Sequence, residues 1–393
     1  MSRPDSVWFA TLSTSEQKEL EAGPCDELLT TPDVLVVGGG IIGLATAYYL
    51  AERGAAVQLI EADSLASQAS GANAGGIWPN DQGPSHSAGF QQLAFMSRDL
   101  WGRLSLRPGF EFDWRVNGFL NVNAEKFAPS AVECAARYQI EGYTVHAVDG
   151  GQISHLEPSL KAGLAAGLHY PSEAHVHPVK AALSFARAMR AKRGRITTGV
   201  AARSAVAQSG RIVTVETTGG RCTPKYVVSA TGWTAKWLEG AVQPLPPLRP
   251  VIGQLISTAP VPPLLRGAVG GKFLVLQLRT GEIITGGNLL ESESVTPDPN
   301  LSAQIADAAR DLIPALRDVE FRLAWCGRRP ATPDGLPVID RIAGLDNLFL
   351  AGGHFRNGVL LAPATGKLLS DWILTDSPAP ELAPFMAGRF QNT

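Results

Sequence analysis

Hydrophobic residues are grouped most densely near the start of the chain, in DVLVVGGGIIGLATAYYLAERGAAVQLIEAD at residues 33–63. The apolar run that ends at Val37 is typical of a strand buried on both faces. A glycine turn follows, then an apolar helix to about Arg53 with Gly54 as its stop, then a second strand ending at Glu61. The pattern therefore predicts one βαβ unit in this part of the chain.

Two later segments repeat the pattern of an apolar strand followed by a turn of small residues. KYVVSATG, at residues 225–232, predicts a parallel-sheet strand that ends in a turn at Thr231 and Gly232. NLFLAGGHFRNGVLLAPATGKLLSDWIL, at residues 347–374, predicts a strand, a glycine turn and a long helix. These segments share the hydrophobic pattern of the first unit, so we expect their strands to join it in one sheet.

The intervening segments have a different pattern. FEFDWRVNGFLNVN, at residues 110–123, predicts short aromatic strands, and KFLVLQLRTGEIITGGN, at residues 272–288, predicts a hairpin that turns at Thr280 and Gly281. Because alternating βα units are absent there, we expect an antiparallel second domain. STSE, at residues 13–16, is a candidate capping box for a short helix near the N-terminus.

These patterns predict an α/β (α+β) protein with a discontinuous Rossmann-like cofactor domain and an antiparallel-sheet substrate domain. The cofactor domain is expected at residues 33–85, 176–240 and 325–393, after an N-terminal extension of residues 1–32. The substrate domain is expected at residues 86–175 and 241–324.

Charge and cysteine content exclude several kinds of partner. Lys and Arg number 34 against 36 Asp and Glu, so nothing favours nucleic acid or an anionic membrane. The uncharged run at 34–51 has membrane-spanning length, but its triple glycine favours the βαβ reading. The four cysteines lack metal-type spacing and favour a reducing compartment, so we expect a cytoplasmic protein without a metal site. A homo-oligomer is compatible with the sequence.

Gly38, Gly40 and Gly43 form G-x-G-x-x-G between the first predicted strand and helix, which is the context of a dinucleotide site. The glycines allow a tight turn, close approach to a pyrophosphate and packing of helix on strand. Phosphates are favoured at the helix N-terminus. Glu61 is placed to accept hydrogen bonds from the adenosine ribose, which disfavours the 2′-phosphate of NADP.

Two further small-residue loops favour FAD over NAD. ASGANAGG lies at residues 69–76, and AGGHFRNG at residues 351–358 opens the last predicted helix. An isoalloxazine ring needs contacts at its far end, and a helix N-terminus near residues 356–360 favours the negative charge of a reduced flavin.

The motifs GGGIIGLATAYYLAERG, SGANAGGI, WxGxRPxTPDGLPVI and GHFRNGVLLAPATG together resemble the glycine oxidase group of the D-amino-acid oxidase superfamily. The resemblance runs from about Asp33 to Ile373 and does not include the N-terminal thirty residues. It implies the D-amino-acid oxidase fold with an FAD-binding domain and noncovalent FAD. In addition to the fingerprint glycines, the implied FAD-contacting positions are Ile41, Ile42, Glu61, Ala62, Ala69, Ser70, Ala74, Gly75, Gly76, Val200, Thr231, Gly232, Gly353, His354, Phe355, Asn357, Gly358, Val359 and Leu360.

The resemblance also assigns two adjacent arginines different roles. In W-x-G-x-R-P the arginine before the proline holds the substrate carboxylate, which selects Arg329. Arg356 matches a second family position close to the substrate. Arg328 stands where the family usually has an apolar residue, so we expect it to point elsewhere. A guanidinium suits a carboxylate because it donates two parallel hydrogen bonds.

The chain departs from the family pattern in the expected substrate pocket. Glycine oxidases resemble one another in a tyrosine over the substrate, where this chain has Phe273 and Leu274. Gly76 replaces a residue that is often bulkier, and Trp78 lies nearby. The hypothesis is a roomier, more apolar pocket for an N-substituted glycine with an apolar substituent. The alternative is that another segment supplies the missing hydroxyl group.

The resemblance implies oxidation of the Cα–N bond of a small amino acid by hydride transfer to the flavin. Hydrolysis of the imine then gives glyoxylate and an amine, and dioxygen becomes hydrogen peroxide. One alternative is a flavin dehydrogenase subunit of the D-amino-acid or opine type that passes electrons to a quinone. Another is a noncatalytic flavin-binding subunit. Covalent flavin is not expected, because the cysteine used by sarcosine oxidases aligns with Gly327 and not with Cys326.

Overall fold

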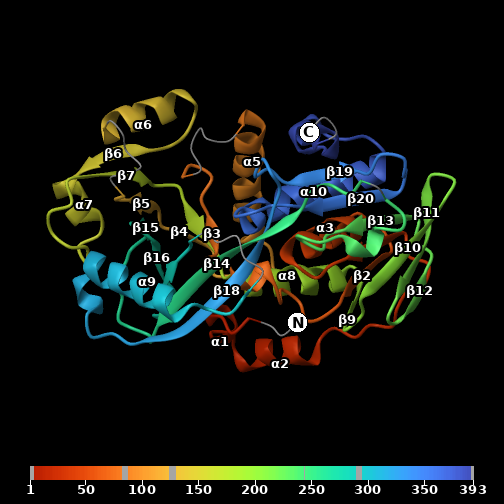
Figure 1. The fold of residues 1–393 in the computed structure, drawn as a ribbon, viewed down its shortest axis with the longest axis horizontal. Coiled ribbons are helices and arrows are strands. Elements are labelled where there is room, and N and C mark those ends of the chain that lie inside the picture. Colours follow the sequence, from red (N-terminus) through yellow and green to blue (C-terminus); the bar gives the residue numbers. More distant parts are fainter. Residues whose placement is uncertain (1–3, 82–86, 124–129, 243, 289–293, 391–393) are drawn as a thin grey trace.

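The computed structural model describes residues 4–81, 87–123, 130–242, 244–288 and 294–390. Within these ranges the strands form four sheets, of which the two largest lie on opposite sides of the molecule (Figure 1). The N-terminal helices pass beneath the junction between them, at the lower edge of Figure 1.

The strands of the predicted βαβ unit belong to a mostly parallel sheet. In the described chain the order of its six strands is β19 (Val338–Arg341), β20 (Leu348–Gly352), β13 (Tyr226–Ser229), β1 (Val34–Val37), β2 (Val57–Glu61) and β9 (Arg195–Thr198). All neighbouring strands are parallel except β19 and β20. Every residue of β1 is buried, which explains its uninterrupted apolar sequence.

Three helices cover this sheet. α3 (Ile41–Glu52) packs against both α10 (Gly358–Thr375) and α8 (Pro178–Ala191). A Cβ atom on Gly366 would lie 2.7 Å from the backbone carbonyl carbon of Ala45, so α10 and α3 meet at backbone distance. This position between two helices explains why α3 is apolar around almost its whole circumference.

The second large sheet is mixed, with parallel and antiparallel neighbours. Among the described residues its eight strands are ordered β18 (Phe321–Ala331), β14 (Arg249–Thr258), β17 (Ile283–Gly286), β16 (Leu274–Gln277), β15 (Ala268–Gly270), β5 (Phe119–Asn121), β7 (Ala166–Tyr170) and β6 (His146–Asp149). β15 and β5 are parallel, and the other neighbours are antiparallel. The predicted hairpin of β16 and β17 is confirmed. Three helices pack on these strands: α6 (Ala131–Ile140), α7 (Gly150–Leu156) and α9 (Pro299–Leu312).

Two small sheets and several short elements complete the described fold. One sheet contains β10 (Ala202–Gln208), β11 (Arg211–Thr217) and β12 (Gly220–Cys222), and the other contains β3 (Gly76–Ile77), β8 (Ala174–His175) and β4 (Arg115–Val116). α4 (Ala69–Ala72) precedes β3, and α5 (Ala88–Leu104) packs on α10. Short 3-10 segments lie at Lys236–Leu238, Pro314–Leu316, Pro380–Phe385 and Ala387–Phe390.

The described part of the N-terminal extension, residues 4–32, forms two helices, α1 (Val7–Ala10) and α2 (Thr14–Ala22). The predicted capping box is confirmed, because the Ser13 side chain accepts from the backbone of Glu16 and the Glu16 carboxylate accepts from the backbone of Ser13. The helix therefore begins where the sequence predicts it.

The division into two domains stays a proposal. Strand pairing concerns one of its expected boundaries, at residue 325. β18 pairs with β14 from Phe321 to Ala331, so the expected boundary at residue 325 falls inside one continuous strand. The motif around Arg329 precedes a strand of the six-stranded sheet in sequence, but its own hydrogen bonds place it in the other sheet. In the described part of the chain, no helix is both long and apolar enough to span a membrane.

Candidate cofactor and substrate site

A cavity of about 580 Å³ is walled by residues of both large sheets. It brings together nearly all of the positions that the sequence singles out. These are Gly38, Gly40, Ile41, Ile42, Glu61, Ala62, Ala69, Ser70, Ala74, Gly75, Gly76, Trp78, Val200, Thr231, Gly232, Phe273, Leu274, Arg329, His354, Phe355, Arg356, Asn357, Gly358, Val359 and Leu360.

Gly43 and Gly353 do not line the cavity. A Cβ atom on Gly43 would lie 2.0 Å from the carbonyl oxygen of Gly38, so this glycine lets α3 pack on the turn before it. Gly353 lies in the turn after β20, where a Cβ atom would lie 2.7 Å from Thr332. Both residues shape the cavity through the backbone, as expected for the third glycine of the fingerprint.

The glycine turn places the N-terminus of α3 at the cavity wall. Gly40 is the N-cap residue, and the backbone N–H of Ile41 donates to Ser70 Oγ over 3.0 Å. This hydroxyl group joins the turn to the loop that precedes β3. A helix N-terminus with small residues around it fits the pyrophosphate of a dinucleotide.

Glu61 ends β2 and is held rigidly beside this turn. Its Oε2 atom accepts from the backbone N–H of Gly39 at 2.6 Å, and its Oε1 atom accepts from that of Asp63 at 2.9 Å. Burial raises the pKa of the carboxyl group, and the two hydrogen bonds oppose that shift. A carboxylate fixed at the end of the second strand fits an adenosine ribose.

The turn before α10 forms another part of the cavity wall. Phe355 donates its backbone N–H to the carbonyl oxygen of Pro330 at 2.6 Å, which ties this turn to β18. His354 is buried, its Nε2 atom lies 3.1 Å from Thr365 Oγ1, and burial lowers its pKa to about 3. The ring is therefore neutral at physiological pH. α10 begins at Gly358, which confirms the predicted helix N-terminus.

Arg329 extends from β18 across the neighbouring strand into the cavity. A Cβ atom on Gly253 of β14 would lie only 2.0 Å from Nη1 of Arg329, so the guanidinium lies directly over this glycine. Nη1 donates to the carbonyl oxygen of Asn288 at 2.9 Å. Desolvation, with the nearby charge of Arg356, lowers the pKa of Arg329 to about 10. The guanidinium therefore remains charged at physiological pH.

No carboxylate forms an ion pair with Arg329 among the residues that the structure describes. A desolvated cation without an acidic partner is unfavourable unless a ligand supplies the negative charge. Arg328 also lines the cavity, and its guanidinium carbon lies 6.0 Å from the ring centroid of Trp233. Both adjacent arginines thus line the cavity, so the expectation that Arg328 points elsewhere is not confirmed.

Aromatic and aliphatic side chains form another part of the cavity wall. Phe273, Leu274 and Trp78 line the cavity together with Phe119, whose ring centroid lies 5.1 Å from that of Trp78. A Cβ atom on Gly76 would lie 2.5 Å from the Trp78 indole. The Trp78 indole therefore occupies the space beside Gly76, and the wall is apolar there.

Gly253 and Asn288 were not among the sequence-predicted site residues. An isolated glycine inside a predicted strand indicates a close approach of another group, which was the available signal for Gly253. Asn288 had no such signal, because its contact depends on the register of β14 and β18. None of the four cysteines lines the cavity, and Cys326 Sγ points to Gln254 Oε1 at 3.8 Å.

Several known proteins resemble this chain in sequence. Glycine oxidase of Geobacillus kaustophilus is 31% identical over 91% of this chain and 97% of its own length. The hydrogen cyanide synthase subunit HcnC of Pseudomonas aeruginosa is 26% identical over 92% of this chain and 97% of its own length.

The crystal structure of glycine oxidase from Geobacillus kaustophilus superposes with a TM-score of 0.85 at 27% identity. That superposition covers 91% of this chain and 99% of the crystallised one. Residues 33–372 match the sequence profile of the FAD dependent oxidoreductases, which begins where the N-terminal extension ends. The chain belongs to the FAD dependent oxidoreductase family.

Proposed function

We propose that this protein oxidises the Cα–N bond of glycine or of an N-substituted glycine. The observation that carries the proposal is Arg329, a desolvated guanidinium that meets no carboxylate of the described protein and projects into the cavity. Such a group fits the carboxylate of an amino acid. Arg356, which also lines the cavity, adds a second positive charge at the same end.

The residues present fit FAD, which supplies the hydride acceptor of the reaction when bound. Arg329 would fix the substrate carboxylate and thereby orient the Cα–H bond, so the protein contributes mainly position. No side-chain base is assigned, because a neutral amine can supply the electron pair that assists loss of the hydride. The net reaction converts R–NH–CH₂–COO⁻, O₂ and H₂O into R–NH₂, glyoxylate and H₂O₂.

The apolar wall supports an apolar substituent on the substrate nitrogen. Phe273 and Leu274 occupy the positions at which the family resemblance predicts a tyrosine, and Trp78 covers Gly76. Gln277, on the same strand, cannot replace that hydroxyl group, because it is buried and bonds to backbone groups of residues 261–265 and 281. An N-alkyl glycine would bury its chain against these side chains.

The test is anaerobic mixing of the purified yellow protein with glycine, sarcosine, a D-amino acid and a long-chain N-alkyl glycine. Flavin bleaching followed by absorbance reports the reductive half-reaction. We expect the fastest bleaching with the N-alkyl glycine. Fastest bleaching with glycine or a D-amino acid would reject the apolar-substituent proposal, and no bleaching with any of them would reject amino-acid oxidation.

Arg329→Ala tests the carboxylate site, with Arg328→Ala as the adjacent control. Loss of a buried charged partner typically costs 2–5 kcal/mol, so kcat/KM for the best substrate should fall on the order of 10²–10³-fold in Arg329→Ala. Arg328→Ala should change it by less than about tenfold. Equal kinetics for the two variants would contradict the assignment.

We further propose that dioxygen is the electron acceptor, that FAD is held noncovalently and that the enzyme works in the cytoplasm. All four cysteines are free and none reaches the cavity, which supports the last two points. The alternative is a dehydrogenase, which the similarity to HcnC keeps open. Hydrogen peroxide formed in proportion to substrate consumed would support the oxidase. Turnover with artificial acceptors but not in air would support the dehydrogenase.

A further inference from the structure

The loop that forms one wall of the cofactor cavity is built from small residues. We call residues 68–76 the cofactor loop, and all of them except Gly71 line the cavity. Its only helix, α4, has four residues, so the loop offers few apolar contacts of its own. A segment of this kind needs support from outside to keep one conformation.

The N-terminal extension supplies support on the outer side of this loop. Ser6 Oγ donates to the carbonyl oxygen of Gly71 at 2.6 Å, and Trp8 Nε1 donates to that of Asn73 at 2.6 Å. Both donor residues are only 1% exposed. A Cβ atom on Gly71 would lie only 2.6 Å from the Phe9 ring, so this ring packs directly on the glycine. Within the described chain none of residues 4–32 lines the cavity, so the extension contacts only the outer face of the loop.

Asn73 transmits this support through the loop. Its Nδ2 atom donates to the carbonyl oxygens of Ala69 and Ser70 at 3.0 and 2.7 Å, and its Oδ1 atom accepts from the backbone N–H of Gly75 at 2.7 Å. Ser70 in turn accepts from the first residue of α3. One chain of hydrogen bonds therefore runs from Trp8 to the helix N-terminus that fits the pyrophosphate.

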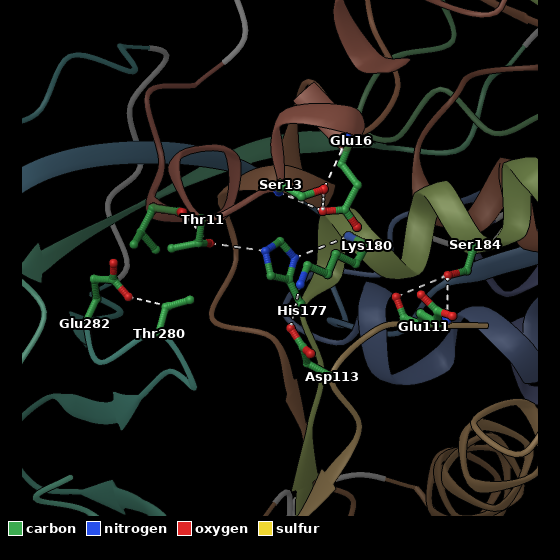
Figure 2. A network of polar contacts seen from close by, with 11 residues as sticks. Thr11, Ser13, Glu16, Glu111, Asp113, His177, Lys180, Ser184, Thr280 and Glu282 are labelled. Carbon is green, nitrogen blue, oxygen red and sulfur yellow. Dashed lines mark hydrogen bonds and ion pairs between the residues drawn. The ribbon is translucent and has the colours of Figure 1, made fainter. Parts of the chain in front are cut away.

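The extension is itself anchored to α8, as Figure 2 shows around His177. His177 Nδ1 accepts from the backbone N–H of Lys180 at 3.2 Å, which leaves Nε2–H to donate to Thr11 Oγ1 at 3.2 Å. Thr11 Oγ1 then donates to the carbonyl oxygen of Val7 at 2.8 Å. The Trp8 indole meets the His177 ring edge-on with centroids 5.0 Å apart.

We propose that residues 6–12 form a clamp that holds the cofactor loop in its FAD-binding conformation, with Trp8 and Ser6 as positioning residues. When the clamp is intact, the loop is preorganised in the free protein. When the clamp is weakened, part of the apoprotein holds the loop in other conformations. The apparent FAD affinity then falls in proportion to the fraction of molecules whose loop has the FAD-binding conformation. The clamp acts on the cofactor and is independent of which substrate the enzyme takes.

Trp8→Phe tests the clamp, because it keeps an aromatic ring and removes the N–H donor. Titration of apoprotein with FAD, followed by flavin fluorescence, gives the dissociation constant. We expect an increase of about tenfold for Trp8→Phe and about threefold for Ser6→Ala, as for loss of one buried hydrogen bond. The flavin content after gel filtration should fall in the same order.

Trp372→Phe is the matched control. Trp372 is buried on α10, and its Nε1 atom has no hydrogen-bond partner in the described protein. This variant removes the same atoms without removing a donated hydrogen bond. Dissociation constants of Trp8→Phe and Ser6→Ala within twofold of the wild type would overturn the proposal, as would an equal loss in Trp372→Phe. If Trp8→Phe does not fold, Ser6→Ala alone decides by the same criterion.

Discussion

At the scale of single residues, Gly253 determines whether Arg329 can reach the cavity. A methyl group at Gly253 would overlap the guanidinium, whose nearest atom would be 2.0 Å away. The guanidinium is the end of a flexible side chain, so it can move at modest cost to stability. We expect Gly253→Ala to lower kcat/KM by about 10²-fold, because a substrate carboxylate would then lose its bidentate partner.

Gly240→Ala is the control for this change, because a Cβ atom on Gly240 would meet no heavy atom within 4 Å. We expect both variants to bind FAD like the wild type and only Gly253→Ala to lose activity. Steady-state kinetics on FAD-saturated protein, with the dissociation constant of FAD measured in parallel, check this expectation. Wild-type kcat/KM in Gly253→Ala would show that Arg329 does not need its observed position.

His177 should make the stability of the protein depend on pH. Its pKa is lowered to about 4, first by burial and then by Lys180, against the opposite influence of Asp113 and Glu16. The unfolded state, with a pKa near 6.5, therefore binds more protons than the folded state between these values. The contribution of His177 to the free energy of unfolding is therefore largest above pH 6.5 and falls as the pH is lowered toward 4.

The His177→Asn variant isolates this contribution, because asparagine is also a good N-cap residue for α8. Between pH 7 and pH 5 the free energy of unfolding of the wild type should fall by about 2 kcal/mol more than that of the variant, as the two pKa values of His177 imply. Urea unfolding at both pH values measures the difference. His155→Asn, at an exposed position, is the control for the substitution itself. An equal loss in His177→Asn would contradict the expectation.

At the scale of elements, the βαβ unit depends on two glycines with positive φ at opposite ends of α3. Gly38 has φ of +116°, and a Cβ atom there would lie 2.5 Å from the carbonyl oxygen of Ala230. Gly54 has φ of +89°, and a Cβ atom there would meet nothing within 4 Å. The two positions share backbone strain for alanine, but only the first adds a collision with backbone.

We therefore expect Gly54→Ala to lower stability by about 1–2 kcal/mol with FAD binding unchanged. Gly38→Ala should cost more stability and also weaken FAD binding on the order of tenfold or more, because the turn must shift. Thermal unfolding of the apoproteins and FAD titration separate these effects. The outcome that would contradict this account is equal FAD affinity in the two variants.

Sequence patterns predicted the elements that are continuous along the chain. The strand, turn and helix around Gly38 and the hairpin of β16 and β17 were confirmed because local periodicity and turn residues determine them. The expected boundary at residue 325 falls inside β18, since the extent of this strand depends on pairing with β14, which is distant in sequence. Local signals do not carry that register.

At the scale of the whole molecule, the fold class and the family were predicted from motifs, whereas the clamp was not. The motifs identified residues that line one cavity, because each motif is a contiguous turn or loop whose residues lie together in the fold. The contacts of Ser6 and Trp8 with the cofactor loop join residues about 65 positions apart. No periodicity in the N-terminal extension indicates such a partner, so only the packed structure reveals it.

The cavity also predicts how ligands should stabilise the two halves of the molecule. Gly38, Glu61 and Val200 line it from the six-stranded sheet and the segments that follow its strands, whereas Leu255 and Arg329 line it from the eight-stranded sheet. ADP carries only the groups expected at the first wall. FAD carries a flavin ring that should reach the second. Saturation at 100 times the dissociation constant stabilises a protein by about 2.7 kcal/mol.

Hydrogen exchange of apoprotein with saturating ADP or FAD separates these contributions. We expect ADP to slow exchange in β1, β2 and the start of α3, and FAD to slow it there and also in β14, β16 and β18. The reason is that bound FAD would join both sheets, so local opening of either would require its release. Protection by FAD confined to the six-stranded sheet would place the flavin outside the wall that carries Arg329, and the proposed geometry of oxidation would then fail.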